Sequence, residues 1–165
     1  TVDYGATEKQ TNFVFTSLMF VGGASASVAG GIKINTLAVV LVAMLSTMQG
    51  RSHARFFSRE IPDVQVRLAL LVGAIATAFV FSIVALLTLS NSDFDFLDLF
   101  FESVSAFGTV GWSTGITPQL SDWGHLILVV AMFVGRIGPF TVGLAMAQRT
   151  ESDPYRFAQE RVTIG

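Results

Sequence analysis

The chemistry that this sequence offers lies in backbone oxygen atoms and not in a catalytic set of side chains. The run in question is Thr109, Val110, Gly111, Trp112 and Ser113. Carbonyl oxygens in such a run can replace the water around a bare cation such as K+, as they do in potassium pores. A glycine can turn its carbonyl inward at little steric cost. We predict an ion filter with K+ ligands at 109–111 and Gly111 central; the alternative is an ordinary tight turn between two core helices.

A glycine-rich loop is predicted at 22–33, between the apolar runs 11–22 and 34–48. Neither run has the about 20 residues that a helix needs to cross a bilayer, so together they predict one crossing that is broken in its middle. Irregular backbone at membrane depth is tolerated only where it lines a watery cavity or is buried in protein. We therefore place the loop under the filter; the alternative is a flexible soluble linker. The candidate residues are Gly22, Gly23, Ala24, Ser25, Ala26, Ser27, Gly30, Gly31 and Lys33.

Two cations stand beside apolar residues. Arg136 lies about twelve residues into the run 123–147, and a charge inside a membrane segment is a functional candidate by default. We predict that Arg136 faces the pore, where it holds the glycine-rich loop or repels cations. The alternative is an interfacial arginine that extends to water. Lys33, at the end of the loop, is expected to add an electrostatic barrier.

The composition excludes an ordinary soluble domain. Hydrophobic residues make up 52% of the chain and charged residues 13%, with a mean hydropathy of +0.62; soluble chains carry about 25% charged residues. There is no cysteine, and hence no disulfide framework or thiolate metal site. Nothing in the sequence suggests a nucleic-acid partner. No nucleophile–base pair or phosphate motif is seen, so we expect no enzyme, and an intramembrane enzyme remains a distant alternative.

The elements that position these residues are predicted as an outer helix at 68–90, a pore helix at 94–107, a filter at 108–113 and an inner helix at 122–149. A pore helix of about fourteen residues is roughly 20 Å long, so it enters the membrane without crossing it. Its negative end points at the filter and favours a cation. The start of this helix is acidic, with Asp93, Asp95 and Asp98; we favour capping over cation concentration for them.

Basic residues predict the orientation. The linker 51–67 and the tail 150–165 hold most of the arginines, and the positive-inside rule places both in the cytoplasm. Pro62 predicts that a helix starts at Asp63 or just before it, and Ser121 or Asp122 is expected to cap the last helix. His53 and His125 are isolated and show no metal spacing.

An internal repeat organises the chain. Residues 19–22 (Met-Phe-Val-Gly) recur at 132–135, a shift of 132 − 19 = 113. The repeat makes 1–50 an inner helix of one unit and 68–149 a complete following unit. Because the filter glycine of the earlier unit would fall before Thr1, we expect the chain to be part of a longer polypeptide. The fold class is therefore an all-α integral membrane protein built from helix–pore-loop–helix repeats.

Several segments of the sequence resemble those of a known family. The segments 22–33, 107–115 and 135–141 are similar to those of the Trk, Ktr and plant HKT potassium-uptake superfamily, and the linker 57–62 and tail 160–165 most resemble the Ktr membrane subunits of the KtrB type. The resemblance covers essentially all 165 residues. It corresponds to the last inner helix of repeat three plus all of repeat four. Trp112 and Ser113 depart from the Tyr-Gly of potassium channels, but the superfamily commonly keeps only the glycine.

The resemblance implies a function and partners. It implies potassium uptake across the cell membrane by a multi-pass homodimer, with the glycine-rich loop as the gate. It also implies a cytoplasmic KtrA-like ring that binds ATP or ADP and regulates the gate, and sodium (Na+) dependence in many members. The alternatives are a gated cation channel without sodium coupling, a TrkH-like transporter subunit, and a non-conducting membrane scaffold or sensor that inherited the fold.

Overall fold

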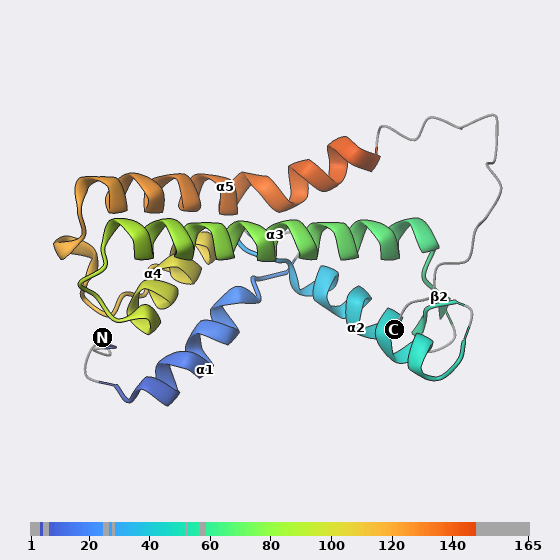
Figure 1. Cartoon of the computed structure of the whole chain (residues 1–165). Helices are drawn as coiled ribbons and strands as arrows, with labels where there is room; N and C mark the ends of the chain where they lie inside the picture. Colours follow the sequence, from blue (N-terminus) through green and yellow to red (C-terminus); the bar gives the residue numbers. More distant parts are fainter. Residues whose placement is uncertain are drawn as a thin grey trace.

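The computed structural model describes residues 4, 7–24, 27, 29–51, 53–56 and 59–147, with 138–147 described as helix backbone. Its first half consists of two short helices that meet at an angle (Figure 1). Helix α1 is Lys9–Phe20 and helix α2 is Ile34–Met48. The break between them falls where four glycines, poor helix formers, interrupt the apolar sequence. The apolar runs on either side of the loop therefore form separate helices, and the described residues between them (21–24, 27 and 29–33) are not helical. That α1 and α2 together make one membrane crossing stays a prediction.

The second half contains the long helices. Helix α3 is Asp63–Ser90, helix α4 is Phe96–Gly108 and helix α5 is Asp122–Ala147; the 3₁₀ turn η2, Thr117–Gln119, precedes α5. Helices α3 and α5 run side by side along the molecule, and the short helix α4 packs against both and against α1 (Figure 1). The strands β1 (Arg55–Phe56) and β2 (Arg59–Glu60) form an antiparallel hairpin beside α2.

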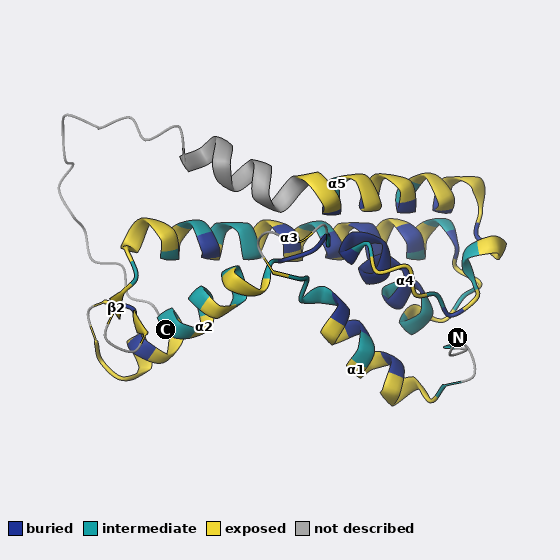
Figure 2. Ribbon diagram, turned by 180° about the vertical axis from the view of Figure 1, so that it is seen from behind, coloured by how far each residue is buried: buried dark blue, intermediate teal, exposed yellow. Residues whose placement is uncertain are grey.

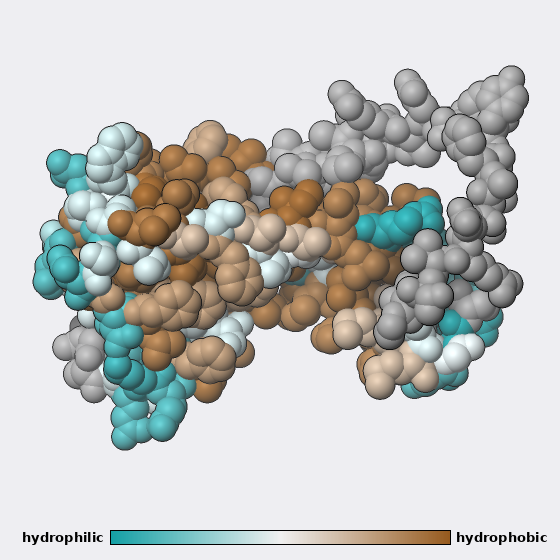
Figure 3. Space-filling model, viewed as in Figure 1, coloured by the Kyte–Doolittle hydropathy of each residue, from teal (hydrophilic) through white to brown (hydrophobic). Residues whose placement is uncertain are grey.

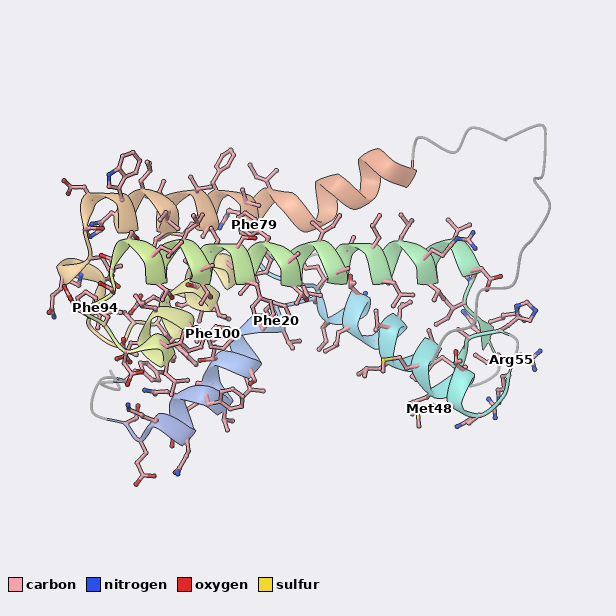
Figure 4. All side chains as sticks on the ribbon, in the orientation of Figure 1. Phe20, Met48, Arg55, Phe79, Phe94 and Phe100 are labelled. Atoms are coloured by element: carbon pink, nitrogen blue, oxygen red, sulfur yellow. The ribbon has the colours of Figure 1, made fainter. Side chains whose placement is uncertain are left out.

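Helix α4 is the most enclosed element, and Figure 2 shows it among the buried residues. Every residue from Phe101 to Gly108 is buried. Phe101, Val104 and Phe107 pack with the buried side chains of α3 on one side, and Leu99 packs with Leu128 of α5 on another. In Figure 4, Phe20 and Phe79 lie in the middle of the molecule, where both rings lie close to the ring of Phe107. This core fixes the end of α4 between the other helices.

The outer surface suits a membrane. Among the described residues, α3 is the one helix that is long and apolar enough to span a bilayer, with a mean hydropathy of 2.7 in an 18-residue window. Its 28 residues correspond to about 42 Å of helix, more than the about 30 Å of a hydrocarbon core. The space-filling view shows a hydrophobic middle with hydrophilic side chains gathered toward the two ends (Figure 3).

The element boundaries differ from the sequence prediction at three places. Helix α3 begins at Asp63, as Pro62 predicted, so 63–67 is helix and not part of the linker. The hairpin at 55–60 was not predicted, because its strands have two residues each and carry no alternating pattern. Helix α4 is 96–108 and not 94–107, because Asp95 is its N-cap. Residues 148–165, the end of the predicted inner helix and the tail, lie outside the described part of the chain.

The predicted caps are largely confirmed. Ser121 caps α5, since its Oγ accepts a hydrogen bond from Gly124 N at 3.1 Å. Asp95 caps α4 by accepting from Leu97 N, as the capping interpretation required. The Asp95 carboxylate also forms an ion pair with Lys9 at the start of α1. Among the described residues, Asp93 and Asp98 make no ion pair.

Candidate ion filter and glycine-rich loop

The candidate filter begins where α4 ends. Thr109 N donates to Ala106 O at 3.1 Å and Val110 N donates to Ser105 O at 3.0 Å, which is the Schellman arrangement of a helix end. That arrangement needs a left-handed residue, and here it is Thr109, with φ 51°. A β-branched residue is strained in this conformation. Such strain persists only where surrounding contacts impose it, and it is common at functional sites.

The carbonyl oxygens of residues 109–112 differ in whether they accept a hydrogen bond. Among the described residues, no donor reaches the carbonyl oxygens of Thr109, Val110 or Gly111. The next carbonyl, that of Trp112, accepts from Ser105 Oγ at 2.5 Å. Gly111 is exposed and has φ 85°, a backbone conformation that side chains disfavour. The three carbonyls that have no donor among the described residues are the three that the sequence analysis named as K+ ligands.

The segment after these carbonyls wraps around a buried carboxylate. Glu102 is 4% exposed and lies in the middle of α4. Its Oε1 accepts from Thr114 N at 2.9 Å and Ser113 Oγ at 2.5 Å, and its Oε2 accepts from Thr117 Oγ1 at 2.8 Å. A buried carboxylate is costly unless it is hydrogen-bonded, so these contacts make Glu102 and the segment interdependent.

Aromatic side chains also support the run. The ring of Trp112 stacks on Tyr4 at 5.0 Å between centroids, and Phe15 of α1 meets it edge-on at 5.6 Å. Tyr4 also contacts Phe15 and Phe101. Aromatic pairs of this kind add about 0.5–1.5 kcal/mol beyond their burial. Tyr4 therefore helps to hold a residue that follows it by 112 − 4 = 108 positions.

The glycine-rich loop folds back on itself. Gly22 N donates to Ile32 O at 2.7 Å, and Ile34 N donates to Gly23 O at 3.2 Å, so the two ends of the loop are joined. The Lys33 ammonium donates to Ser27 O at 3.0 Å and also to Ala29 O. The Lys33 ammonium thus binds carbonyl groups of the loop. The predicted role of Lys33 as an electrostatic barrier did not include these hydrogen bonds.

The loop lies directly against the end of α4 and the middle of α5. Gly30 N donates to Thr109 Oγ1 at 2.9 Å, and Gly31 N donates to Gly135 O at 3.3 Å. A Cβ on Gly30 would lie 2.8 Å from Phe107 O, and one on Gly135 would lie 2.0 Å from the same oxygen. The backbones of the loop, α4 and α5 therefore meet at Phe107 with no room for side chains. Gly30 and Gly31 of the loop thus lie beside the first residue of the candidate filter, and the roles of both segments stay predictions.

Arg136 is next to this junction but does not join it. Its side chain is exposed, and it makes no hydrogen bond or ion pair with the described residues. Its neighbour Gly135 is the residue whose carbonyl accepts the hydrogen bond from Gly31 N of the loop. Ser25 and Ala26, two of the predicted loop residues, lie outside the described residues, as does Val28. The role of Arg136 as a gate partner stays a prediction.

Sequence reasoning missed three functional candidates. It left Glu102 without a role, although a carboxylate inside a short apolar helix must find donors and hydroxyl-rich residues follow at 113–117. It did not assign a role to Gly135, which belongs to the repeated Met-Phe-Val-Gly but stands inside a continuous helix. It also missed Tyr4, because no local pattern links a residue before α1 to Trp112.

A family model and several known proteins are similar to this chain over nearly all of its length. The model of the TrkH family, described as "Cation transport protein", matches residues 1–156. Ktr system potassium uptake protein D of Bacillus subtilis (strain 168) is 35% identical over 165 residues, 100% of this chain and 36% of that protein. Protein B of the same system and organism is 37% identical over 164 residues, 99% and 36% of the two chains.

A third relative, potassium/sodium uptake protein NtpJ of Enterococcus hirae, is 34% identical over 158 residues, 90% of this chain and 34% of that protein. The chain thus spans about a third of the length of these curated relatives.

Proposed function

We propose that this chain, which belongs to the TrkH family of cation transport proteins, is the C-terminal part of a potassium-uptake subunit of the Ktr type. The family consists of transporters and not of enzymes, and its members act in membranes. The printed names of the relatives at 34–37% identity speak of potassium or potassium/sodium uptake. We extend that substrate to this chain as part of the proposal.

The observation that carries the proposal is the difference between neighbouring carbonyl groups. The oxygens of Thr109, Val110 and Gly111 accept nothing from described residues, while that of Trp112 is taken by Ser105. Carbonyls without protein donors are available to replace the hydration shell of a cation. The carboxyl end of α4 lies directly before them, and its partial negative charge favours a cation.

In the proposed mechanism, potassium loses water at a ring of carbonyls to which this chain contributes 109–111 and three partner repeats contribute the rest. The ion then meets the glycine-rich loop, which lies beside the filter and acts as the gate. Contacts of Gly30 and Gly31 support this role, because they join the loop to Thr109 and to α5. Arg136 and Lys33 add positive charge below the filter.

The proposal extends to assembly and orientation. We place the hairpin and the C-terminal tail in the cytoplasm and the start of α4 near the outer face, by the positive-inside rule. We propose a multi-pass homodimer in the cell membrane, regulated by a KtrA-like cytoplasmic ring that binds ATP or ADP. We also propose that uptake depends on sodium.

Ion flux in liposomes that carry the full-length transporter tests the proposal. The expected result is potassium flux that is faster with sodium present and that responds to the nucleotide on the regulatory ring. Potassium flux without sodium dependence would instead favour a gated cation channel. Absence of any flux from well-folded protein would favour a non-conducting scaffold and would overturn the proposal.

A further inference from the structure

Glu102 stands out because it is a charged residue in the most buried helix. It is 4% exposed, and both of its carboxylate oxygens accept hydrogen bonds from Ser113, Thr114 and Thr117. All of these donors belong to the segment that directly follows the free carbonyls. In the part of the chain that the structure describes, Glu102 forms no ion pair with a basic residue, so its hydrogen bonds to this segment are its polar contacts.

The main chain does not hold this segment in place. From Gly111 to Gly115, the backbone makes no main-chain hydrogen bond to the described residues. Side chains hold it instead: the rings of Tyr4 and Phe15 pack on Trp112, and polar side chains of α4 bind the rest. Ser105 Oγ donates to Trp112 O at 2.5 Å, and Glu102 engages the residues after it. Positions 102 and 105 are three apart and so share one face of α4, which makes this face the support of the filter segment.

Ser113 and Thr117 complete a compact network. Ser113 Oγ donates to Glu102 and accepts from Gly115 N at 2.9 Å. The hydroxyls of Ser113 and Thr117 are 3.0 Å apart, so both lie against the same carboxylate. Hydrogen bonds to a charged group are worth about 1.5–3 kcal/mol each. The removal of one carboxylate therefore releases several contacts that fix the path of the chain away from the filter.

We propose that Glu102 is the positioning residue of the filter. It touches no ion; it anchors the segment 113–117 and thereby fixes the direction in which the carbonyls of Val110 and Gly111 point. Discrimination between potassium and sodium requires a carbonyl cage of defined number and geometry, so selectivity depends on this carboxylate. The inference rests on the proposed function, because it takes 109–111 as the ion-binding run.

The chemistry of Glu102 predicts a graded series of variants. Glu102→Gln keeps one acceptor oxygen for Thr114 N and places an amide that can donate to Thr117 Oγ1, so most of the anchor survives. Glu102→Ala removes every contact. We expect the preference for potassium over sodium to fall by about tenfold in Glu102→Ala, equivalent to about 1.4 kcal/mol, and by less in Glu102→Gln.

The experiment measures potassium and sodium flux in liposomes with the full-length transporter carrying each variant. Glu8→Gln is the matched control, because Glu8 is exposed and makes no side-chain cap bond. Folding is checked by size-exclusion chromatography and thermal unfolding. A second readout is the potassium concentration that protects each variant from thermal unfolding, which is expected to rise in Glu102→Ala and to stay unchanged in Glu8→Gln.

Unchanged selectivity in folded Glu102→Ala, with lower stability alone, would assign Glu102 a merely structural role and overturn the inference. If Glu102→Ala does not fold, unchanged selectivity and potassium protection in Glu102→Gln overturn it. Gly111→Ser is measured in parallel to separate the two proposals. A change in Gly111→Ser without any change in the Glu102 variants keeps the filter and rejects the anchor, whereas no change in any variant rejects both.

Discussion

The amide of Gly30 donates a 2.9 Å hydrogen bond to the hydroxyl of Thr109, across 79 positions of sequence. This contact joins the glycine-rich loop to the first residue of the candidate filter. Thr109 is also the residue with the left-handed backbone. Because one side chain serves both elements, a displacement of the loop removes a contact that helps to hold Thr109 in its strained conformation. The glycine-rich loop and the candidate filter are therefore linked through Thr109.

We expect Thr109→Val to loosen the closed loop. The substitution keeps the β-branched shape and removes the hydroxyl that accepts from Gly30 N. The loss of one hydrogen bond of about 1 kcal/mol is expected to raise the ratio of resting flux to fully activated flux by about fivefold over the wild type. The measurement is potassium flux in liposomes without and with the activating nucleotide. Thr109→Ser keeps the hydroxyl and is the control; equal ratios in the two variants would speak against the link.

We expect Gly111→Ser to weaken discrimination between potassium and sodium. A side chain at Gly111 meets open space, but the φ of 85° is a conformation that costs an ordinary residue about 1–2 kcal/mol. Relaxation of this strain turns the carbonyl and disturbs the cage. Gly50→Ser is the matched control, because Gly50 has φ 69° and open space at the end of α2. Uptake competition between the two ions would show equal selectivity for both variants if the filter assignment were wrong.

We expect Gly135→Ala to destabilise the protein. The added Cβ would lie 2.0 Å from Phe107 O, a backbone atom that cannot move aside cheaply. Overpacking of this kind costs about 1–3 kcal/mol, seen as a lower midpoint of thermal unfolding in detergent. Gly73→Ala in α3 is the control, since nothing lies within 4 Å of its Cβ position and alanine favours a helix. A similar midpoint for both variants would contradict the three-backbone junction.

We expect Arg136→Ala and Lys33→Met each to raise potassium flux through the closed state. Arg136 is the predicted positive charge under the filter, and Lys33 holds the loop through the carbonyls of Ser27 and Ala29. A deletion within 25–29 is expected to act in the same direction. Arg67→Ala, which removes an exposed arginine of α3, is the control. Flux that stays at or below the wild-type rate in folded variants would argue against the loop as the obstruction.

We expect the ion pair of Lys9 and Asp95 to contribute evenly across neutral pH. The hydrogen bond from Lys9 lowers the pKa of Asp95, and that same hydrogen bond raises the pKa of Lys9. The contribution of Asp95 is lost only as the pH falls through its lowered pKa, and that of Lys9 only as the pH rises through its raised pKa.

A double-mutant cycle with Lys9→Gln and Asp95→Asn therefore gives the same coupling from about pH 5 to about pH 9. Asparagine keeps the capping oxygen, so the cycle isolates the charge pair. Because both groups are exposed, added salt reduces the coupling. A coupling that changes steeply between pH 6 and pH 8 would point to a different partner for Asp95.

The elements of this protein follow from local sequence. The apolar run 34–48 coincides with α2, Pro62 precedes the first residue of α3, and the glycines at 22–31 end α1. Each of these features depends on residues within a few positions of one another, through helix propensity, capping and the length of apolar runs. The same local logic placed 109–113 directly after a short buried helix and supplied the resemblance to the family.

Only the tertiary structure decided what holds these elements together. Glu102 finds its hydrogen-bond donors at 113–117, and Trp112 stacks on Tyr4. Position 135 requires a glycine, since Phe107 O occupies the space that a Cβ would need. These contacts join residues that are distant in sequence, and they depend on side-chain reach and backbone approach that no periodic pattern encodes. The sequence by itself determined where the helix breaks and where the run 109–113 follows a short helix. The packing of α1, α4 and α5 decided which side chains keep that run in place.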